Sequence, residues 1–138
     1  MSDKPEHSRE ERRKYKRAED IFIVTYRLKS PFEVALQVGD RDFAAVAVDI
    51  GEGGMGVDVM QEIPVGTQLR LKFEIENPVS VSPQNRRRRF ELDGESRYCE
   101  VTPKQTYRVG CLFKSISVED RAFIAEYVKD QALRKYVS

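Results

Sequence analysis

Two arginines near the amino terminus, Arg13 and Arg17, stand four residues apart within the basic run Arg12–Arg17. A guanidinium group can donate two parallel hydrogen bonds to guanine, lie flat on a purine ring, or pair with a phosphate. A basic run flanked by acidic residues, as this one is, is more often a solvated charge cluster. The two arginines therefore need a second feature beside them before they indicate a binding site.

That second feature is the stretch Asp49–Val57, DIGEGGMGV, which contains four glycines. Gly51, Gly53 and Gly56 fit the spacing of a dinucleotide-binding loop, but such a loop holds the pyrophosphate at the start of a helix. Here the following residues alternate between apolar and polar types as far as Pro64, so no long helix can begin there. The lysine and hydroxyl residue of a phosphate-binding P-loop are absent as well.

Two interpretations of the glycine stretch remain. It can be a tight connection between two strands, which would use the access of glycine to positive φ. It can also be a place where a ligand approaches the backbone, opposite the guanidinium groups of Arg13 and Arg17. The combination of the two features favours a guanine nucleotide site.

The composition indicates one soluble domain. The chain has 138 residues, of which 40% are hydrophobic and 34% charged, and its formal net charge is +1. No apolar run approaches the roughly 20 residues that span a bilayer, and the amino terminus lacks the apolar core of a signal peptide. We therefore expect a cytoplasmic location. Cys99 and Cys111 lie in apolar runs without a CxxC pair, so we expect buried free thiols and no metal site.

Short strand-like segments fill most of the chain. The clearest is Gln68–Glu76, in which apolar and charged residues alternate, as in a strand with one face in water. Residues 77–89, which include Arg86–Arg89, are expected to form a loop, and Gly94 a bulge or turn. The other expected strands are Ile21–Leu28, Val34–Val38, Phe43–Asp49, Met55–Met60, 90–101 and Tyr107–Phe113.

The chain ends in a helical pattern. Ser117 can cap a helix, and Phe123 with Tyr127 and Ile124 with Val128 form an apolar stripe. Several short strands followed by one helix, without strand–helix–strand units, predict an antiparallel barrel or curled sheet with the helix packed against it or across its mouth.

The same residues resemble a known family. An R-x-x-x-R element followed further along the chain by D/N-x-S-x-x-G is similar to the signature of PilZ domains, which are bacterial receptors for cyclic di-GMP. Arg13 and Arg17 match the two arginines, and Asp49 and Gly54 match the first and last positions of the second element. The resemblance continues in IPVGTQLRLKF and in YRVGCLFKSISVEDRAFIAEYV, so it covers about residues 9–137.

The resemblance implies a mainly β fold, a six-stranded antiparallel PilZ-type barrel with a C-terminal helix. We expect residues 1–11 to be a mobile arm and residues 12–138 to be the domain. It also implies that the arginines hold guanine and phosphate, while the acidic residue and the serine contact a guanine edge. The serine is replaced by Gly51 in this chain. The implied cyclic di-GMP contacts are Arg12, Arg13, Arg17, Asp49, Gly51, Gly53 and Gly54.

The function expected from the resemblance is a cyclic di-GMP receptor that passes its signal to a protein effector. The alternative is a PilZ adaptor that has lost the ligand and acts by protein contact alone. A nucleic-acid binder that uses the curved sheet and both basic runs is a weaker alternative, because RNP-like aromatic residues are lacking. No set of Ser, His and Asp or of Cys and His suggests catalysis, so we expect no enzyme, catalytic residue or cofactor. For Arg86–Arg89 a solvated loop or a protein-contact patch is favoured.

Overall fold

A computed structural model of the protein describes residues 17–18, 21–80, 83 and 86–137. The predicted arm at residues 1–11 lies outside these residues, as do Arg12 and Arg13. The elements in chain order are β1 (Arg17–Ala18), β2 (Phe22–Ser30), α2 (Phe32–Val38), β3 (Phe43–Gly51), β4 (Gly54–Val59), β5 (Gln68–Glu76), β6 (Arg87–Val101), β7 (Tyr107–Phe113) and α3 (Val118–Val137).

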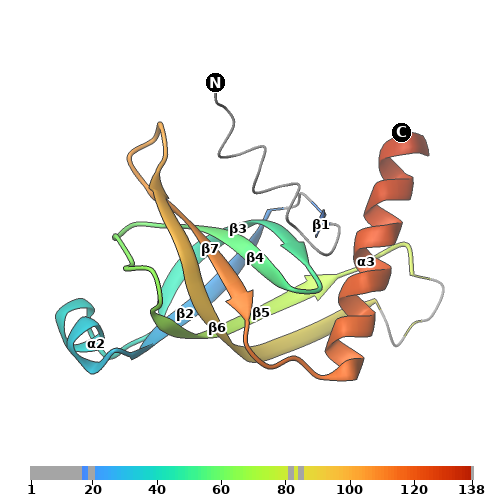
Figure 1. The fold of residues 1–138 in the computed structure, drawn as a ribbon. Coiled ribbons are helices and arrows are strands. Elements are labelled where there is room, and N and C mark those ends of the chain that lie inside the picture. The colour runs from blue at the N-terminus through green and yellow to red at the C-terminus, as the bar shows by residue number, and fades with distance from the viewer. Residues whose placement is uncertain (1–16, 19–20, 81–82, 84–85, 138) are drawn as a thin grey trace.

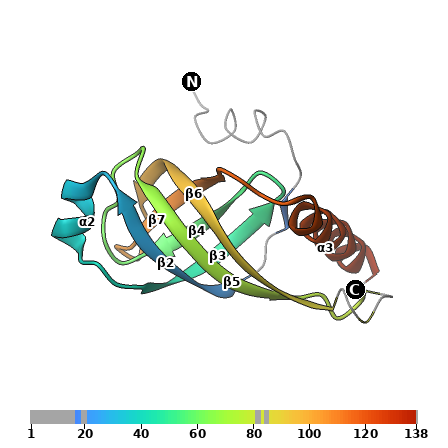
Figure 2. The ribbon, with the colours of Figure 1, turned by 90° about the horizontal axis from the view of Figure 1, so that it is seen from below.

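The strands form one antiparallel sheet that closes on itself. The strand order is β1-β3-β2-β5-β6-β7-β4, and a further pairing of β3 with β4 joins the two ends. Strands β2 to β7 therefore make a closed six-stranded barrel, with α2 at one end and α3 at the other (Figures 1 and 2). The short β1 continues the position of β2 along β3, since Phe22 pairs with Ala47 and Ala18 pairs with Ile50. The predicted barrel with a C-terminal helix is confirmed.

Alternation along the strands builds the core. In β5 the apolar residues Leu69, Leu71, Phe73 and Ile75 are all buried, whereas the charged residues between them face solvent. The ring of Phe73 stacks on that of Phe90 in β6 at a centroid distance of 4.8 Å. Burying such side chains removes apolar area from water, which is the main term that stabilises a barrel of this size.

Helix α3 packs by the predicted stripe. Phe123, Ile124, Tyr127 and Val128 are all buried, and Phe90 meets Phe123 edge-on at 5.7 Å. The backbone N–H of Asp120 donates to the Ser117 hydroxyl at 3.0 Å, which confirms the predicted cap. The helix therefore begins where the sequence places it and covers one end of the barrel.

The expected strand Val34–Val38 is wrong, because these residues belong to α2. Val34, Ala35 and Val38 pack against the core, so their burial follows a helical spacing rather than the alternation of a strand. Gly39, at φ +121°, ends the helix by donating its N–H to the Ala35 carbonyl. A segment of five residues is too short for its pattern to distinguish the two structures.

Two further expectations about β6 are corrected. Gly94 lies inside the strand rather than at a turn, and a β-carbon there would stand 2.9 Å from Leu71 Cδ1. The strand begins at Arg87, so three of the four consecutive arginines are in a strand and not in a loop. Their β5 partners Glu74, Ile75 and Glu76 continue the ladder beyond the barrel wall.

Cys111 is buried and Cys99 is half-buried, and they do not form a disulfide. Within the described part of the chain, neither helix combines the length and apolarity needed to cross a bilayer.

Candidate ligand-binding site

The first component of the candidate site is a backbone pairing between the amino-terminal segment and β3. Arg17 is the register partner of Gly51, and Ala18 is the partner of Ile50. Ala18 and Ile50 are both buried, so apolar contacts reinforce this short ladder. The two halves of the sequence signature, which lie more than thirty positions apart in the chain, thus meet at Arg17 and Gly51.

The glycine stretch forms the tight turn between β3 and β4. Gly51 pairs with Gly54, and Glu52 and Gly53 make the turn. This confirms a strand-to-strand connection, but positive φ is not what the turn uses. Among the described residues, the glycines with positive φ are Gly39 and Gly66.

The final glycine of the signature has a packing role. A β-carbon at residue 54 would overlap the backbone carbonyl oxygen of Cys111 in β7. The neighbouring Gly53 carbonyl accepts a hydrogen bond from the Phe113 N–H at 2.9 Å. Gly54 therefore allows the turn to pack closely against β7, and this role does not depend on a ligand.

A β-bulge places Asp49 on the outer face of the barrel. Ala45 and Ala47 point into the core, and strict alternation would send Asp49 inward as well. The register against β4 shifts between Ala47 and Asp49, which turns the carboxylate outward. Its Oδ1 atom accepts a hydrogen bond from the Gly56 N–H at 2.9 Å. A β-carbon on Gly56 would lie 3.2 Å from both carboxylate oxygens, so the carboxylate lies over that glycine.

A second bulge does the same for Tyr98 in β6. Leu92 and Ser96 are buried, and alternation would bury Tyr98 too. The register against β7 shifts between Ser96 and Tyr98, so Tyr98 faces outward opposite Gly110. Its ring occupies the space in which a β-carbon of residue 110 would stand.

The two bulges converge on one row across four strands. Asp49 pairs with Gly56, Gly56 with Gly110, and Gly110 with Tyr98. We call Gly56 and Gly110 the glycine floor. The two glycines contribute no side chains of their own, and the Asp49 carboxylate lies over Gly56 while the Tyr98 ring lies over Gly110. A carboxylate can accept hydrogen bonds from the N–H groups of a base edge, and an aromatic ring can stack on a base, so the row is suited to a nucleobase.

Arg108 and Asp58 form the next row beside the glycine floor. They are register partners on β7 and β4, and the Arg108 guanidinium donates to Asp58 through Nε and through Nη2, the latter at 3.3 Å. The pKa of Arg108 is raised, chiefly by this hydrogen bond, and the charge of Asp49 contributes in the same direction. Asp49 and Arg108 therefore share one electrostatic environment.

The structure thus brings Arg17, Asp49, Gly51 and Gly54 to one place, with Gly53 in the turn between them. Sequence reasoning missed Tyr98, Arg108 and the glycine floor. The alternation of Met55–Met60 placed Gly56 and Asp58 on a common face. Nothing in the sequence marked the register shifts that bring Tyr98 and Asp49 to that face.

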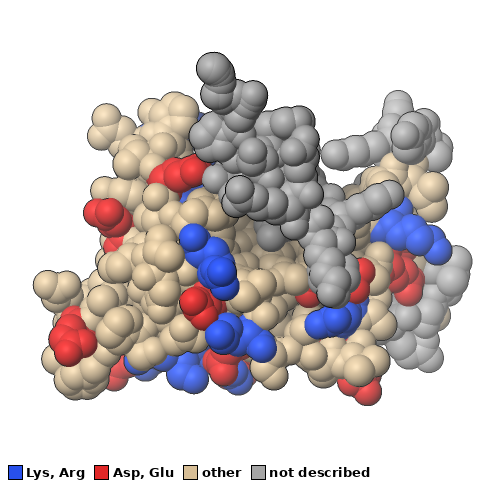
Figure 3. All heavy atoms as spheres, viewed as in Figure 1, with Lys and Arg blue, Asp and Glu red and all other residues tan. Residues whose placement is uncertain are grey.

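Two arginines of the run Arg86–Arg89, Arg87 and Arg88, form ion pairs within the protein. Arg87 pairs with Glu76 and, at 3.5 Å, with Glu74, and Arg88 Nε donates to Asp120 Oδ1 at 2.7 Å. On the face drawn in Figure 3, basic and acidic side chains of the described residues are interspersed rather than separated. These arginines fasten β6 to β5 and to α3, which gives them a structural role.

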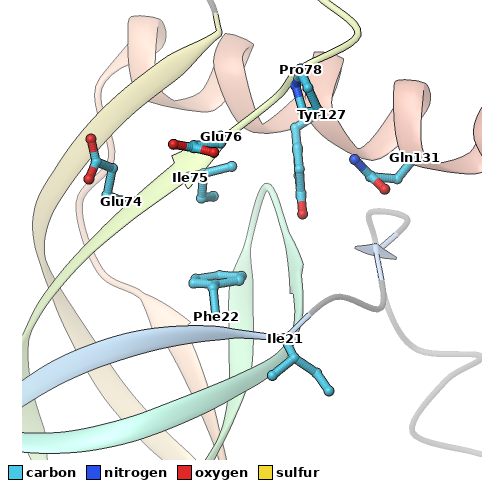
Figure 4. A pocket seen from close by; sticks show the side chains of 8 residues that line it. All are labelled: Ile21, Phe22, Glu74, Ile75, Glu76, Pro78, Tyr127 and Gln131. Atoms are coloured by element: carbon cyan, nitrogen blue, oxygen red, sulfur yellow. The ribbon is translucent and has the colours of Figure 1, made fainter.

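A groove of about 460 Å³ lies away from the glycine floor. It runs between the start of β2, the end of β5 and α3, and none of the sequence-predicted site residues lines it (Figure 4). Its walls are Ile21, Phe22, Glu74, Ile75, Glu76, Pro78, Tyr127 and Gln131.

The comparisons with known proteins agree with this fold. The PilZ domain model matches residues 11–130. The chain therefore belongs to the PilZ family. None of the curated proteins matches the chain.

Solved structures with the same fold include the Bacillus subtilis inhibitor of motility (MotI/DgrA), with a TM-score of 0.69 and 20% identity over 90% of this chain and 53% of that one. The PilZ domain of Escherichia coli YcgR with c-di-GMP has a TM-score of 0.58 and 16% identity, over 92% of this chain and 98% of that one. The MrkH–c-di-GMP complex from K. pneumonia has a TM-score of 0.55 and 13% identity, over 91% of this chain and 55% of that one. The chain spans about half the length of MotI and MrkH, and at these identities the likeness establishes the fold.

Proposed function

We propose that the protein is a cyclic di-GMP receptor, which binds the dinucleotide between the amino-terminal arginines and the Asp49–Gly54 turn and signals through a protein effector. The observation that carries this proposal is the ladder between Arg17 and Gly51, because it sets the last arginine of the amino-terminal run beside the turn. Two structural neighbours, the PilZ domain of YcgR and MrkH, are complexes with c-di-GMP, which supports the same ligand here.

The proposed mechanism uses differential contacts. Arg12, Arg13 and Arg17 hold guanine and phosphate, while Asp49 accepts from a guanine edge beside the glycine floor. The ligand then joins the arm to the barrel, and the surface around β1 changes shape. A ligand that makes these contacts in one state only will shift the population towards that state. The receptor role requires no reaction, so we propose no enzymatic activity.

Isothermal titration of the purified protein with cyclic di-GMP tests the proposal, with GTP and cyclic di-AMP as controls. We expect saturable binding of cyclic di-GMP and none of GTP. The absence of heat and of any affinity up to high micromolar cyclic di-GMP would refute it.

A ligand-free adaptor is the second candidate, and one observation favours it. Gly51 stands where the family signature has a serine, so a hydroxyl that would contact guanine is missing. The same titration separates the two functions, because the adaptor would bind its protein partner but not the dinucleotide.

A further inference from the structure

Arg108 differs from the amino-terminal arginines because the barrel itself supplies it. It stands on β7 next to the glycine floor, two residues before Gly110. Side chains two positions apart on a strand point to the same face, about 7 Å apart. The Arg108 side chain therefore projects from the face that carries Asp49, and 37% of it is exposed.

The contact with Asp58 orients the guanidinium and leaves part of it available. Arginine has five N–H donors, and Asp58 accepts hydrogen bonds from two of those of Arg108. Within the described part of the chain, the other three donors have no partner. A carboxylate on one edge of a guanidinium fixes its plane, so the opposite edge is ready for a second acceptor.

The charge balance of this face indicates which acceptor fits. Asp49 and Asp58 put two carboxylates beside the glycine floor, and cyclic di-GMP carries two phosphates. A cation in the barrel wall offsets the repulsion between these carboxylates and the phosphates of that ligand. Among the described residues, Arg108 supplies such a cation: it forms an ion pair with Asp58 and interacts electrostatically with Asp49.

We propose that Arg108 is a further arginine of the site, which donates to a phosphate of cyclic di-GMP from the barrel side while Asp58 holds its orientation. This inference rests on the proposed function and extends it to a residue outside the sequence signature. The dinucleotide would then be held from two sides, by the arm and by the barrel wall.

Calorimetric titration with cyclic di-GMP tests this role in five variants beside the wild type. Arg108→Ala removes the donor, and we expect binding about ten- to a hundredfold weaker. Arg108→Lys keeps the charge without the fork, so its affinity should lie between the two. Arg70→Ala is the matched control, because Arg70 on β5 is 36% exposed and is paired with Asp93 and Glu91 on β6. It should bind as the wild type does.

Two further variants separate a ligand contact from an effect of the unpaired Asp58. Asp58→Asn removes the carboxylate that orients Arg108 and keeps Arg108 itself, so its affinity should lie between those of the wild type and Arg108→Ala. The double variant Arg108→Ala with Asp58→Asn should remain about tenfold or more weaker. Thermal melts establish that each variant is folded.

The outcomes are distinct. If Arg108→Ala binds cyclic di-GMP as tightly as the wild type, the role of Arg108 is overturned and the receptor function stands. The same holds if the double variant regains the affinity of the wild type. No binding by the wild type overturns the receptor function and the role of Arg108 together. Weaker binding of cyclic di-GMP by Arg108→Ala and by the double variant, but not by Arg70→Ala, supports a ligand contact by Arg108.

Discussion

The carboxylate of Asp49 accepts a hydrogen bond from the backbone N–H of Gly56, its partner on the neighbouring strand, at 2.9 Å. The bond spans a β-bulge, where the regular ladder is interrupted. The side chain therefore provides the acceptor that Gly56 would otherwise lack. The residue that the family signature assigns to the ligand is also part of the barrel.

We predict that Asp49→Ala and Asp49→Asn separate these two roles. Alanine leaves a buried N–H without its acceptor, at a cost of about 1–3 kcal/mol. The melting temperature should fall by about 3–10 °C. Asparagine keeps an oxygen acceptor, so Asp49→Asn should melt close to the wild type yet bind cyclic di-GMP less tightly. Equal melting of both variants would show that the hydrogen bond to Gly56 does not contribute to stability.

Replacing either amino-terminal arginine should weaken ligand binding. Arg13→Ala or Arg17→Ala removes a charge-assisted or stacking contact worth about 1.5–3 kcal/mol, or roughly ten- to a hundredfold in affinity. Arg87→Ala is the control, since the Arg87 side chain is 64% exposed and pairs with glutamates on β5. If Arg87→Ala lost binding of cyclic di-GMP while Arg17→Ala retained it, the assignment of the binding site to Arg17 would be wrong.

Restoring the serine of the family signature should tighten binding. In Gly51→Ser the new hydroxyl can pair with a guanine atom whose unpaired burial costs about 1–3 kcal/mol. The side chain also removes about 0.5–1 kcal/mol of backbone freedom from the unbound turn. We expect about tenfold higher affinity in a side-by-side titration.

The backbone permits this substitution, because Gly51 is not among the glycines with positive φ, Gly39 and Gly66. Thermal melts establish that the serine variant is folded. Equal or weaker binding by a folded Gly51→Ser would mean that glycine suits the ligand geometry of this protein.

Two glycines of the outer face should respond differently to alanine. In Gly54→Ala the new methyl group meets the Cys111 carbonyl oxygen, which belongs to the backbone of β7 and cannot move alone. In Gly110→Ala it meets the ring of Tyr98, a half-buried side chain that can turn away. In chemical denaturation, the free energy of unfolding should therefore fall by more than about 3 kcal/mol for Gly54→Ala and by less for Gly110→Ala. The reverse order would contradict the assigned packing roles.

Hydrogen exchange should locate the ligand on the chain. Cyclic di-GMP should slow amide exchange in residues 9–20 and 49–56 more than in α3, Val118–Val137. Slowing by the same factor throughout the barrel would indicate general stabilisation and would argue against a local bridge between arm and turn.

The sequence determined the elements whose patterns are long and regular. Gln68–Glu76 alternates over nine residues, and the structure has β5 with the same bounds. Ser117 and the apolar stripe of the last segment fixed the start and the buried face of α3. Both signals depend on neighbours in the chain, so they are visible without a structure. Val34–Val38 was too short for such a signal, and it was predicted incorrectly.

The signature residues of the candidate site could also be read from the sequence, because Arg13, Arg17, Asp49 and Gly54 stand at recognisable spacings. That Arg17 lies against Gly51 is decided by strand pairing, which joins residues distant in the chain.

Only the tertiary structure decided which face of the barrel Asp49 and Tyr98 occupy. One extra residue in a strand reverses the face of every residue after it, and both β3 and β6 contain such a shift. A bulge arises from the register of two strands rather than from the residues of one. The row of Asp49, Gly56, Gly110 and Tyr98, with Arg108 beside it, therefore exists only once the barrel has closed.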